Sequence, residues 1–111
     1  MSREEKKLLF DIQASLMAIE SYMQGVSNFD DYQSNPMLQD AVERNLEIIG
    51  EAVGQLLKIN PLIQISNARR MVDTRNFIIH SYDNIDNTRV WTIIINHLPI
   101  LKTEVDNLLK V

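Results

Sequence analysis

The spacing of apolar residues constrains the fold most strongly, because these residues recur every three or four positions along four long segments. In the first segment, residues 3–24, the apolar positions are Leu8, Leu9, Ile12, Leu16, Ile19 and Met23. This spacing places one apolar stripe along an α-helix. The same pattern predicts helices over residues 35–60, over 67–81, and from Asp86 or Asn87 onward. We therefore expect an all-α protein with four to five helices in an up-and-down bundle.

Turn-forming residues separate the expected helices. Gly25 is predicted to end the first helix in the left-handed conformation that glycine adopts without strain. Residues 26–34 are mostly polar and are expected to form a loop. Asn35 followed by Pro36 is typical of a helix start, and the Asn60–Pro61 pair is typical of a helix end. The connections are short, so neighbouring helices should run antiparallel.

Proline and glycine also mark points inside the expected helices. Pro99 lies within the apolar pattern of the last helix and should kink it near Ile95, because proline supplies no backbone N–H. Gly50 and Gly54 lie on one face of the second long helix. Each costs about 1 kcal/mol of helix propensity relative to alanine. A compensating close approach of another helix, or of a second subunit, is the expected reason for both glycines.

Several helices carry more apolar residues than one stripe can hold. Examples are Ile48 beside Ile49, Ile78 beside Ile79, and the run 93–95. The chain has 111 residues, which is the length of one domain, and we treat 1–111 as a single domain. A monomer of this size would leave part of that apolar area exposed. We therefore expect a homodimer with an extensive helical interface.

Composition and charge exclude several classes of protein. The chain has no cysteine, so disulfides and thiolate chemistry are excluded. Its formal net charge of −4 argues against a surface that binds nucleic acid generally, so phosphate chemistry would need a local basic pocket. The charged N-terminus does not resemble an export signal, and no apolar run reaches the ~18 residues of a membrane span. We expect a cytoplasmic protein without a membrane partner.

The segment 75–82 is the strongest candidate for chemistry. It contains Arg75, one of the two histidines (His80) and Tyr82. Five of the six arginines fall between positions 44 and 89. Histidine can move protons near neutral pH, and arginine offers a fixed fork of donors to phosphate oxygens. Together the two residue types suit metal-free cleavage of a phosphodiester.

Helical geometry limits how these residues can meet. Arg75 and His80 are five positions apart, so their directions differ by about 140° on an ideal helix. Asn76 and His80 are four apart and share a face. In a symmetric dimer two copies of the segment could face each other across the two-fold axis. Spacing alone also allows a purely structural interpretation, in which the arginine forms an ion pair and the histidine caps a helix end.

The pattern Arg75-x4-His80-x-Tyr82, with Asn76 directly after the arginine, resembles the R-x4-H-x-Y signature of HepT-like proteins in the HEPN superfamily. Residues 41–52 are similar to the second-helix block of that family. Residues 90–91 and 97–101 resemble its last helix. The resemblance covers residues 40–111, and the N-terminal helix agrees in type and length.

This resemblance implies an all-α homodimer with a metal-independent ribonuclease centre at the dimer cleft, acting on an RNA substrate. It implies Arg75 and His80 as catalytic residues and Asn76 as a supporting one. It also implies a partner, a nucleotidyltransferase of the MNT type, which acts as the antitoxin and silences the nuclease by adenylylating Tyr82. No metal or cofactor is implied.

Other polar residues have competing interpretations. Arg44 and Glu51 lie on one face of the second long helix with Asp40 and Glu47. This face is either a solvated stripe of ion pairs or, for Arg44 and Glu51, part of the cleft as supporting residues. His97, the second histidine, is expected to be structural.

Two other functions remain open at the level of the sequence. One is a catalytically silent helical module that holds a nucleotide or docks the nucleotidyltransferase, which the acidic net charge and Asp73 favour. The other is a purely structural helical dimer, which leaves the motif and the gathered arginines unexplained.

Overall fold

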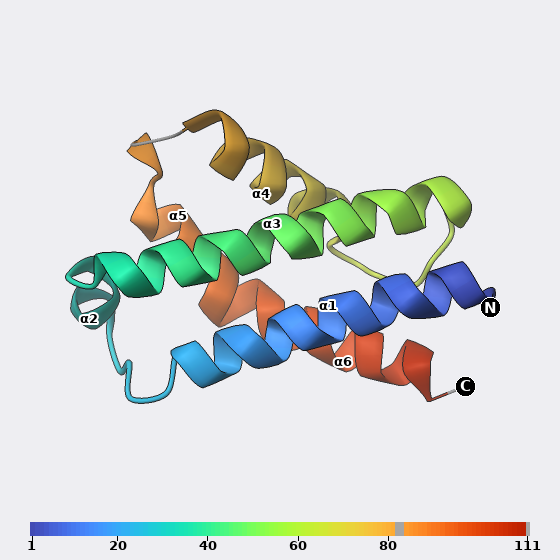
Figure 1. Cartoon of the computed structure of the whole chain (residues 1–111), viewed down its shortest axis with the longest axis horizontal. Helices are drawn as coiled ribbons and strands as arrows, with labels where there is room; N and C mark the ends of the chain where they lie inside the picture. The colour runs from blue at the N-terminus through green and yellow to red at the C-terminus, as the bar shows by residue number, and fades with distance from the viewer. Residues whose placement is uncertain (82–83, 111) are drawn as a thin grey trace.

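Three long helices form the frame of the molecule: α1 (Arg3–Tyr22), α3 (Pro36–Ile59) and α4 (Ala68–Ser81). The structure is a computed structural model that describes residues 1–81 and 84–110. In Figure 1, α3 lies between α1 and α4 and packs along both. The all-α class is confirmed, since the described residues contain helices and no strand.

The last part of the chain forms one nearly continuous helical run. It consists of α5 (Asn87–Thr92), a π-helix (Ile93–His97) and α6 (Leu98–Leu109). This run passes behind α3 in the view of Figure 1, and α6 packs against α1. In the part of the chain that the structure describes, no helix is both long and apolar enough to cross a bilayer.

Polar caps fix the helix starts where the sequence places them. Ser2 and Glu5 form a reciprocal capping box at the start of α1, with both hydrogen bonds at 3.1 Å. The Asn35 side chain accepts a hydrogen bond from the Leu38 N–H at 3.1 Å, and Pro36 follows as the first residue of α3. Gly25 has a φ of +81°, which confirms the left-handed residue expected after α1.

The expected loop over residues 26–34 is wrong in part. A short helix, α2 (Phe29–Gln33), forms within it and is capped by the Asn28 side chain, which accepts from the Asp31 N–H at 2.9 Å. Phe29 and Tyr32 both pack against Trp91 of α5, with ring centroids 6.0 Å apart in each pair. Tertiary contact of two aromatic rings therefore stabilises a helix that is too short to form alone.

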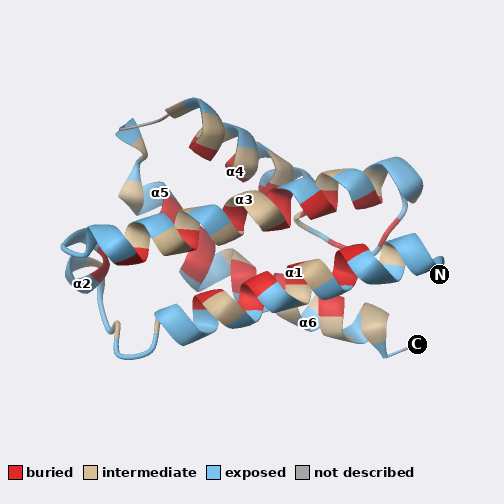
Figure 2. Cartoon of the chain, in the orientation of Figure 1, coloured by how far each residue is buried: buried red, intermediate tan, exposed pale blue. Residues whose placement is uncertain are grey.

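The core follows the apolar stripes. Figure 2 shows the buried side of α1 turned toward α3 and α6. Residues without measurable exposure include Leu9, Ile12, Tyr32, Val42, Ile49, Val53, Leu56, Val90 and Val105. They come from α1, α2, α3, α5 and α6, so a single core joins the elements around α3.

The irregularity that Pro99 predicts in the last helix is confirmed, and it takes the form of a π-helix rather than a simple kink. The Leu98 N–H donates to the Ile93 carbonyl, five residues back instead of four. Pro99 follows as the second residue of α6 and carries no N–H, so the π-helix lies where the regular hydrogen-bond pattern of the helix would be interrupted in any case. The wider turn changes which way the side chains after Ile93 point.

Candidate active site

Gly50 brings α3 and α4 into close contact. A Cβ built on Gly50 would lie 2.6 Å from the Met71 carbonyl oxygen, and closer still to the Cβ of Arg75. Only glycine allows the α4 backbone to approach this near. A Cβ built on Gly54, one turn later, would lie 3.7 Å from a Val72 methyl group, which is an ordinary contact. The expected close helix packing at the glycines is therefore confirmed within the chain, and it is tight at Gly50 alone.

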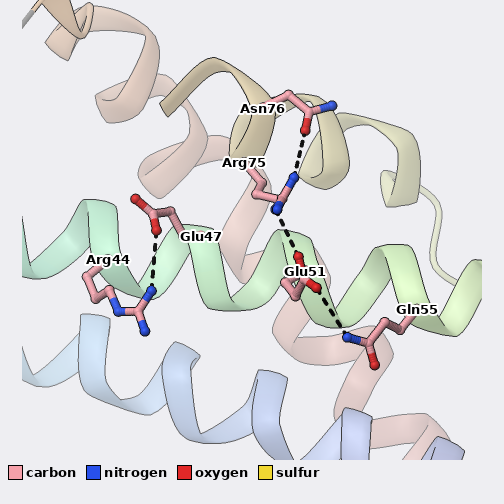
Figure 3. A network of polar contacts seen from close by, with 6 residues as sticks. All are labelled: Arg44, Glu47, Glu51, Gln55, Arg75 and Asn76. Carbon is pink, nitrogen blue, oxygen red and sulfur yellow. Dashed lines mark hydrogen bonds and ion pairs between the residues drawn. The ribbon is translucent and has the colours of Figure 1, made fainter. Parts of the chain in front are cut away.

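The close approach places the Arg75 side chain directly over α3. Its Nε lies 3.0 Å from Glu51 Oε2, and its guanidinium donates to Asn76 Oδ1 at 3.1 Å (Figure 3). Gln55 donates to the second carboxylate oxygen of Glu51 at 3.3 Å. Arg75 is thus oriented from two sides, and Glu51 is itself held by a neighbour.

A shallow hollow of about 170 Å³ lies beside this pair, between α3 and α4. Its lining residues are Gly50, Glu51, Gly54, Gln55, Lys58, Val72 and Arg75. The two glycines leave the space open because they carry no side chain. The Arg75 side chain is 35% exposed, so the remaining guanidinium N–H groups can meet a ligand from solvent.

His80 lies on a different side of α4. It is exposed near the end of the helix, as is Asn76 one turn earlier, in agreement with a shared face for these two residues. His80 is not among the residues that line the hollow with Arg75. The structure therefore brings Arg75, Asn76 and Glu51 together, and it leaves His80 separate within one chain. Tyr82 lies outside the described residues.

Arg44 does not join this group. It pairs with Glu47 at 3.3 Å, and its side chain is 70% exposed. This arrangement matches the solvated stripe expected for the face of α3 rather than the cleft. Glu51, two turns further along, pairs with Arg75 beside the hollow. Of the two supporting residues expected on α3, one therefore contacts Arg75 and the other does not.

An unfavourable cluster of acidic groups lies near this stripe. Burial raises the pKa of the Glu43 carboxyl above its ordinary value, and the neighbouring charges of Asp40 and Glu47 raise it further. The negative potential along this part of α3 would repel a phosphate. The first half of α3 is therefore an unfavourable place for an anion.

Gln55 and the exact role of Gly50 were missed by sequence reasoning. Gln55 is four residues after Glu51, a spacing that places the two side chains side by side on a helix, so this partner could have been found. The contact between Gly50 and Arg75 depends on how α3 and α4 cross, which spacing within either helix does not specify. Among the described residues, no group of three histidine or acidic side chains is arranged as metal ligands would be.

Fold and site together define a helical bundle with a basic motif on α4, the helix that follows the long central helix α3. The family model described as ribonuclease HepT-like matches residues 12–108. A provisionally named RNase of Methanocaldococcus jannaschii, MJ1380, is 32% identical over 94% of this chain and 95% of its own length. “Probable ribonuclease HepT” of Thermococcus cleftensis is 32% identical over 99% of this chain and its full length. No solved structure gives a significant match.

The family match covers most of the chain, and both relatives align along nearly their whole lengths. The protein belongs to the ribonuclease HepT-like family, as its motif and helix blocks indicate.

Proposed function

We propose that this protein is a metal-independent endoribonuclease that works as a homodimer in the cytoplasm, with Arg75 and His80 as its catalytic residues. Membership of the HepT-like family and the names of its relatives support a ribonuclease. The observation that carries the proposal is Arg75, which is fixed by Glu51 and Asn76 at the edge of a hollow while its guanidinium stays partly exposed.

The chemistry requires no group beyond the protein and the RNA. The ribose 2′-hydroxyl attacks the adjacent phosphorus, and the bond from phosphorus to the 5′-oxygen breaks, leaving a 2′,3′-cyclic phosphate. His80 moves the proton, either from the 2′-hydroxyl or to the departing 5′-oxygen. Arg75 stabilises the charge that builds up on the non-bridging oxygens.

A dimer would bring together Arg75 and His80, which lie apart within one chain. Arg75 is turned toward α3 and His80 toward solvent. Two copies of α4 that meet across a two-fold axis would present the exposed histidine of one protomer to the arginine of the other. Large apolar side chains that are about half exposed, such as Phe10 and Ile95, provide area for a subunit interface.

Control of the nuclease would fall to a partner. In our proposal a nucleotidyltransferase of the MNT type acts as the antitoxin and transfers an adenylyl group from ATP to the Tyr82 hydroxyl, releasing pyrophosphate. The bulky, negatively charged adduct would lie two residues from His80 and would repel the RNA phosphate. The motif order in residues 75–82 supports this assignment.

A cleavage assay tests the nuclease. Purified protein is incubated with RNA in the presence of a chelator, beside His80→Ala and Asn45→Ala variants; Asn45, whose side chain donates to the Ala41 carbonyl, is a control outside the motif. We expect cleavage by the wild type and by the control, and a loss of at least about 100-fold in His80→Ala. Equal cleavage by the His80→Ala protein would refute the assignment.

Mass spectrometry tests the switch. The protein is incubated with ATP and a cognate nucleotidyltransferase, and its peptides are searched for an added adenylyl group. We expect the group on Tyr82 and loss of cleavage in the modified fraction. Modification at Tyr22 or Tyr32 instead, or a modified protein that still cuts RNA, would contradict the proposal.

One observation favours the second candidate function, a silent module that binds a nucleotide or docks the nucleotidyltransferase. The Glu51 carboxylate neutralises the Arg75 charge in the structure. A guanidinium that stays paired in this way would hold the helices together rather than stabilise a transition state. A dimer that binds the nucleotidyltransferase tightly but leaves RNA intact under all conditions would establish this alternative.

A further inference from the structure

A second basic hollow lies on another side of α4, away from the contact between Arg75 and α3. Its volume is about 190 Å³, and its lining residues are Arg70, Thr74, Arg89, Thr92, Ile93 and His97. Three elements contribute to it: α4, α5 and the π-helix. Neither the motif nor the proposed chemistry uses any of these residues.

The charges that line this hollow are all of one kind. Among the described residues that line it, Arg70, Arg89 and His97 are the ionisable ones, and none is an aspartate or glutamate. Within residues 1–81 and 84–110, no carboxylate lies within ion-pairing distance of Arg70 or Arg89. In a protein with a net charge of −4, two arginines that face one hollow with no acidic partner among the described residues are an arrangement that favours an anion.

One of the two arginines is oriented before any ligand binds. The Arg89 guanidinium carbon lies 4.2 Å from the centre of the Phe77 ring, and stacking of this kind leaves the N–H groups at the edge free to donate. The hydroxyls of Thr74 and Thr92 already donate to carbonyls four residues back, at 2.8 and 3.0 Å. The donors that remain for an anion are therefore the two guanidinium groups and the imidazole.

The π-helix explains why His97 reaches the hollow. Its wider turn adds one residue between Ile93 and Leu98, which rotates the residues that follow by about 100° relative to a regular helix. Burial, together with the positive charge of Arg70, lowers the pKa of His97. A bound anion would oppose this effect, and the imidazolium would then add a third positive charge.

We propose that this hollow binds one backbone phosphate of an RNA strand, at a position separate from the phosphate that is cleaved. The volume of about 190 Å³ is many times the ~10–15 Å³ that a single water requires, so the hollow has room for a phosphate group. The inference rests on the proposed function, since it assigns this surface to the same RNA. It also replaces the structural role first expected for His97.

Binding of an RNA that cannot be cleaved tests the inference apart from catalysis. A short 2′-O-methyl oligonucleotide lacks the attacking hydroxyl, so its affinity is measured whether or not the protein is a nuclease. The double variant Arg70→Gln with Arg89→Gln should bind it about tenfold more weakly. The slope of log affinity against log salt should shrink by about 0.7, as expected for one lost phosphate contact on a single strand.

Two matched variants separate a specific site from general charge. Arg3→Gln combined with Arg69→Gln removes the same two positive charges from exposed positions that do not line the hollow, and it should weaken binding less than twofold. Arg70→Lys combined with Arg89→Lys keeps the charge and should restore most of the affinity. The thermal unfolding midpoint of each variant shows whether the protein remains folded.

The imidazole resonances of His97 give an independent readout. We expect them to shift, and the pKa of His97 to rise, when the oligonucleotide is added to the wild-type protein. Three results would overturn the inference. They are equal losses for the two double glutamine variants, a response of His97 to inorganic phosphate but not to RNA, or no response of His97 at all. The RNA could stay intact in the cleavage assay while the variants still show this binding pattern. That result would refute the nuclease activity but would still support the phosphate site.

Discussion

Arg75 is held on two sides by residues of its own chain. Glu51 Oε2 lies 3.0 Å from the Arg75 Nε in an ion pair, and Asn76 Oδ1 accepts a hydrogen bond from the Arg75 guanidinium at 3.1 Å. Both members of the ion pair are more than a third exposed, so the pair should add less than about 1 kcal/mol to stability. The value of the contact is geometric, because a guanidinium that is already oriented loses less freedom when it meets a phosphate.

Replacement of Glu51 tests this positioning role. Glu51→Ala removes the oxygen that receives the Arg75 Nε–H, and we expect kcat for RNA cleavage to fall about tenfold, which is about 1.4 kcal/mol of barrier. Glu51→Gln keeps a side-chain oxygen at the same reach and should retain most of the wild-type kcat. Steady-state kinetics with a labelled RNA measure both variants.

The pair of variants also has a contrary outcome. If Glu51 only screens the positive charge, both variants should bind RNA more tightly, and KM should fall while kcat is unchanged. That result would show that Glu51 acts on RNA binding through its charge and does not position Arg75.

The packing of α3 against α4 determines where the motif lies, and two glycines one turn apart allow its contribution to be measured. Gly50→Ala would place a methyl group 2.6 Å from the Met71 carbonyl oxygen, a backbone atom that can move only if the helices separate. Overpacking of this kind costs about 1–3 kcal/mol, against about 1 kcal/mol gained in helix propensity. We expect a net destabilisation of up to about 2 kcal/mol.

Gly54→Ala is the matched control. Its new methyl group would lie 3.7 Å from a Val72 side-chain carbon, which is ordinary contact, so the gain in helix propensity should prevail. We expect a stabilisation of about 0.5–1 kcal/mol. The urea midpoints of the two variants should therefore move in opposite directions. A shift of both in the same direction would show that the close approach at Gly50 is not what holds the two helices.

The same elements show how far sequence reasoning reaches. The apolar stripes, Asn35 with Pro36, and Gly25 located the long helices because those signals act within one helix. The sequence also located the irregularity before Pro99 but not its π-helical form. It missed α2 because that helix depends on Trp91, which is distant in the sequence. The sequence likewise did not determine the contact of Glu51 with Arg75, since that contact depends on how two helices cross.

At the scale of the whole molecule, one chain presents only part of the motif in one place. Arg75 faces the hollow beside α3, and His80 is exposed on another side of α4. On a helix the two directions differ by about 140°, and no rotamer of either side chain changes the direction of its Cα–Cβ bond. A site that uses both residues on one phosphate is therefore most easily completed by a second copy of the chain.

Mixed dimers test this arrangement. Arg75→Ala and His80→Ala should each be inactive alone. If each site takes its arginine from one protomer and its histidine from the other, a mixed dimer contains one site with both residues and one with neither. Random exchange of equal amounts makes half of the dimers mixed, so activity should return to about a quarter of the wild-type level. Refolding the two variants together, followed by the RNA cleavage assay, measures the recovery. Light scattering on the same sample checks that dimers have formed. If dimers form and cleavage stays absent, each site draws both residues from a single chain, and α4 must then rearrange when RNA binds.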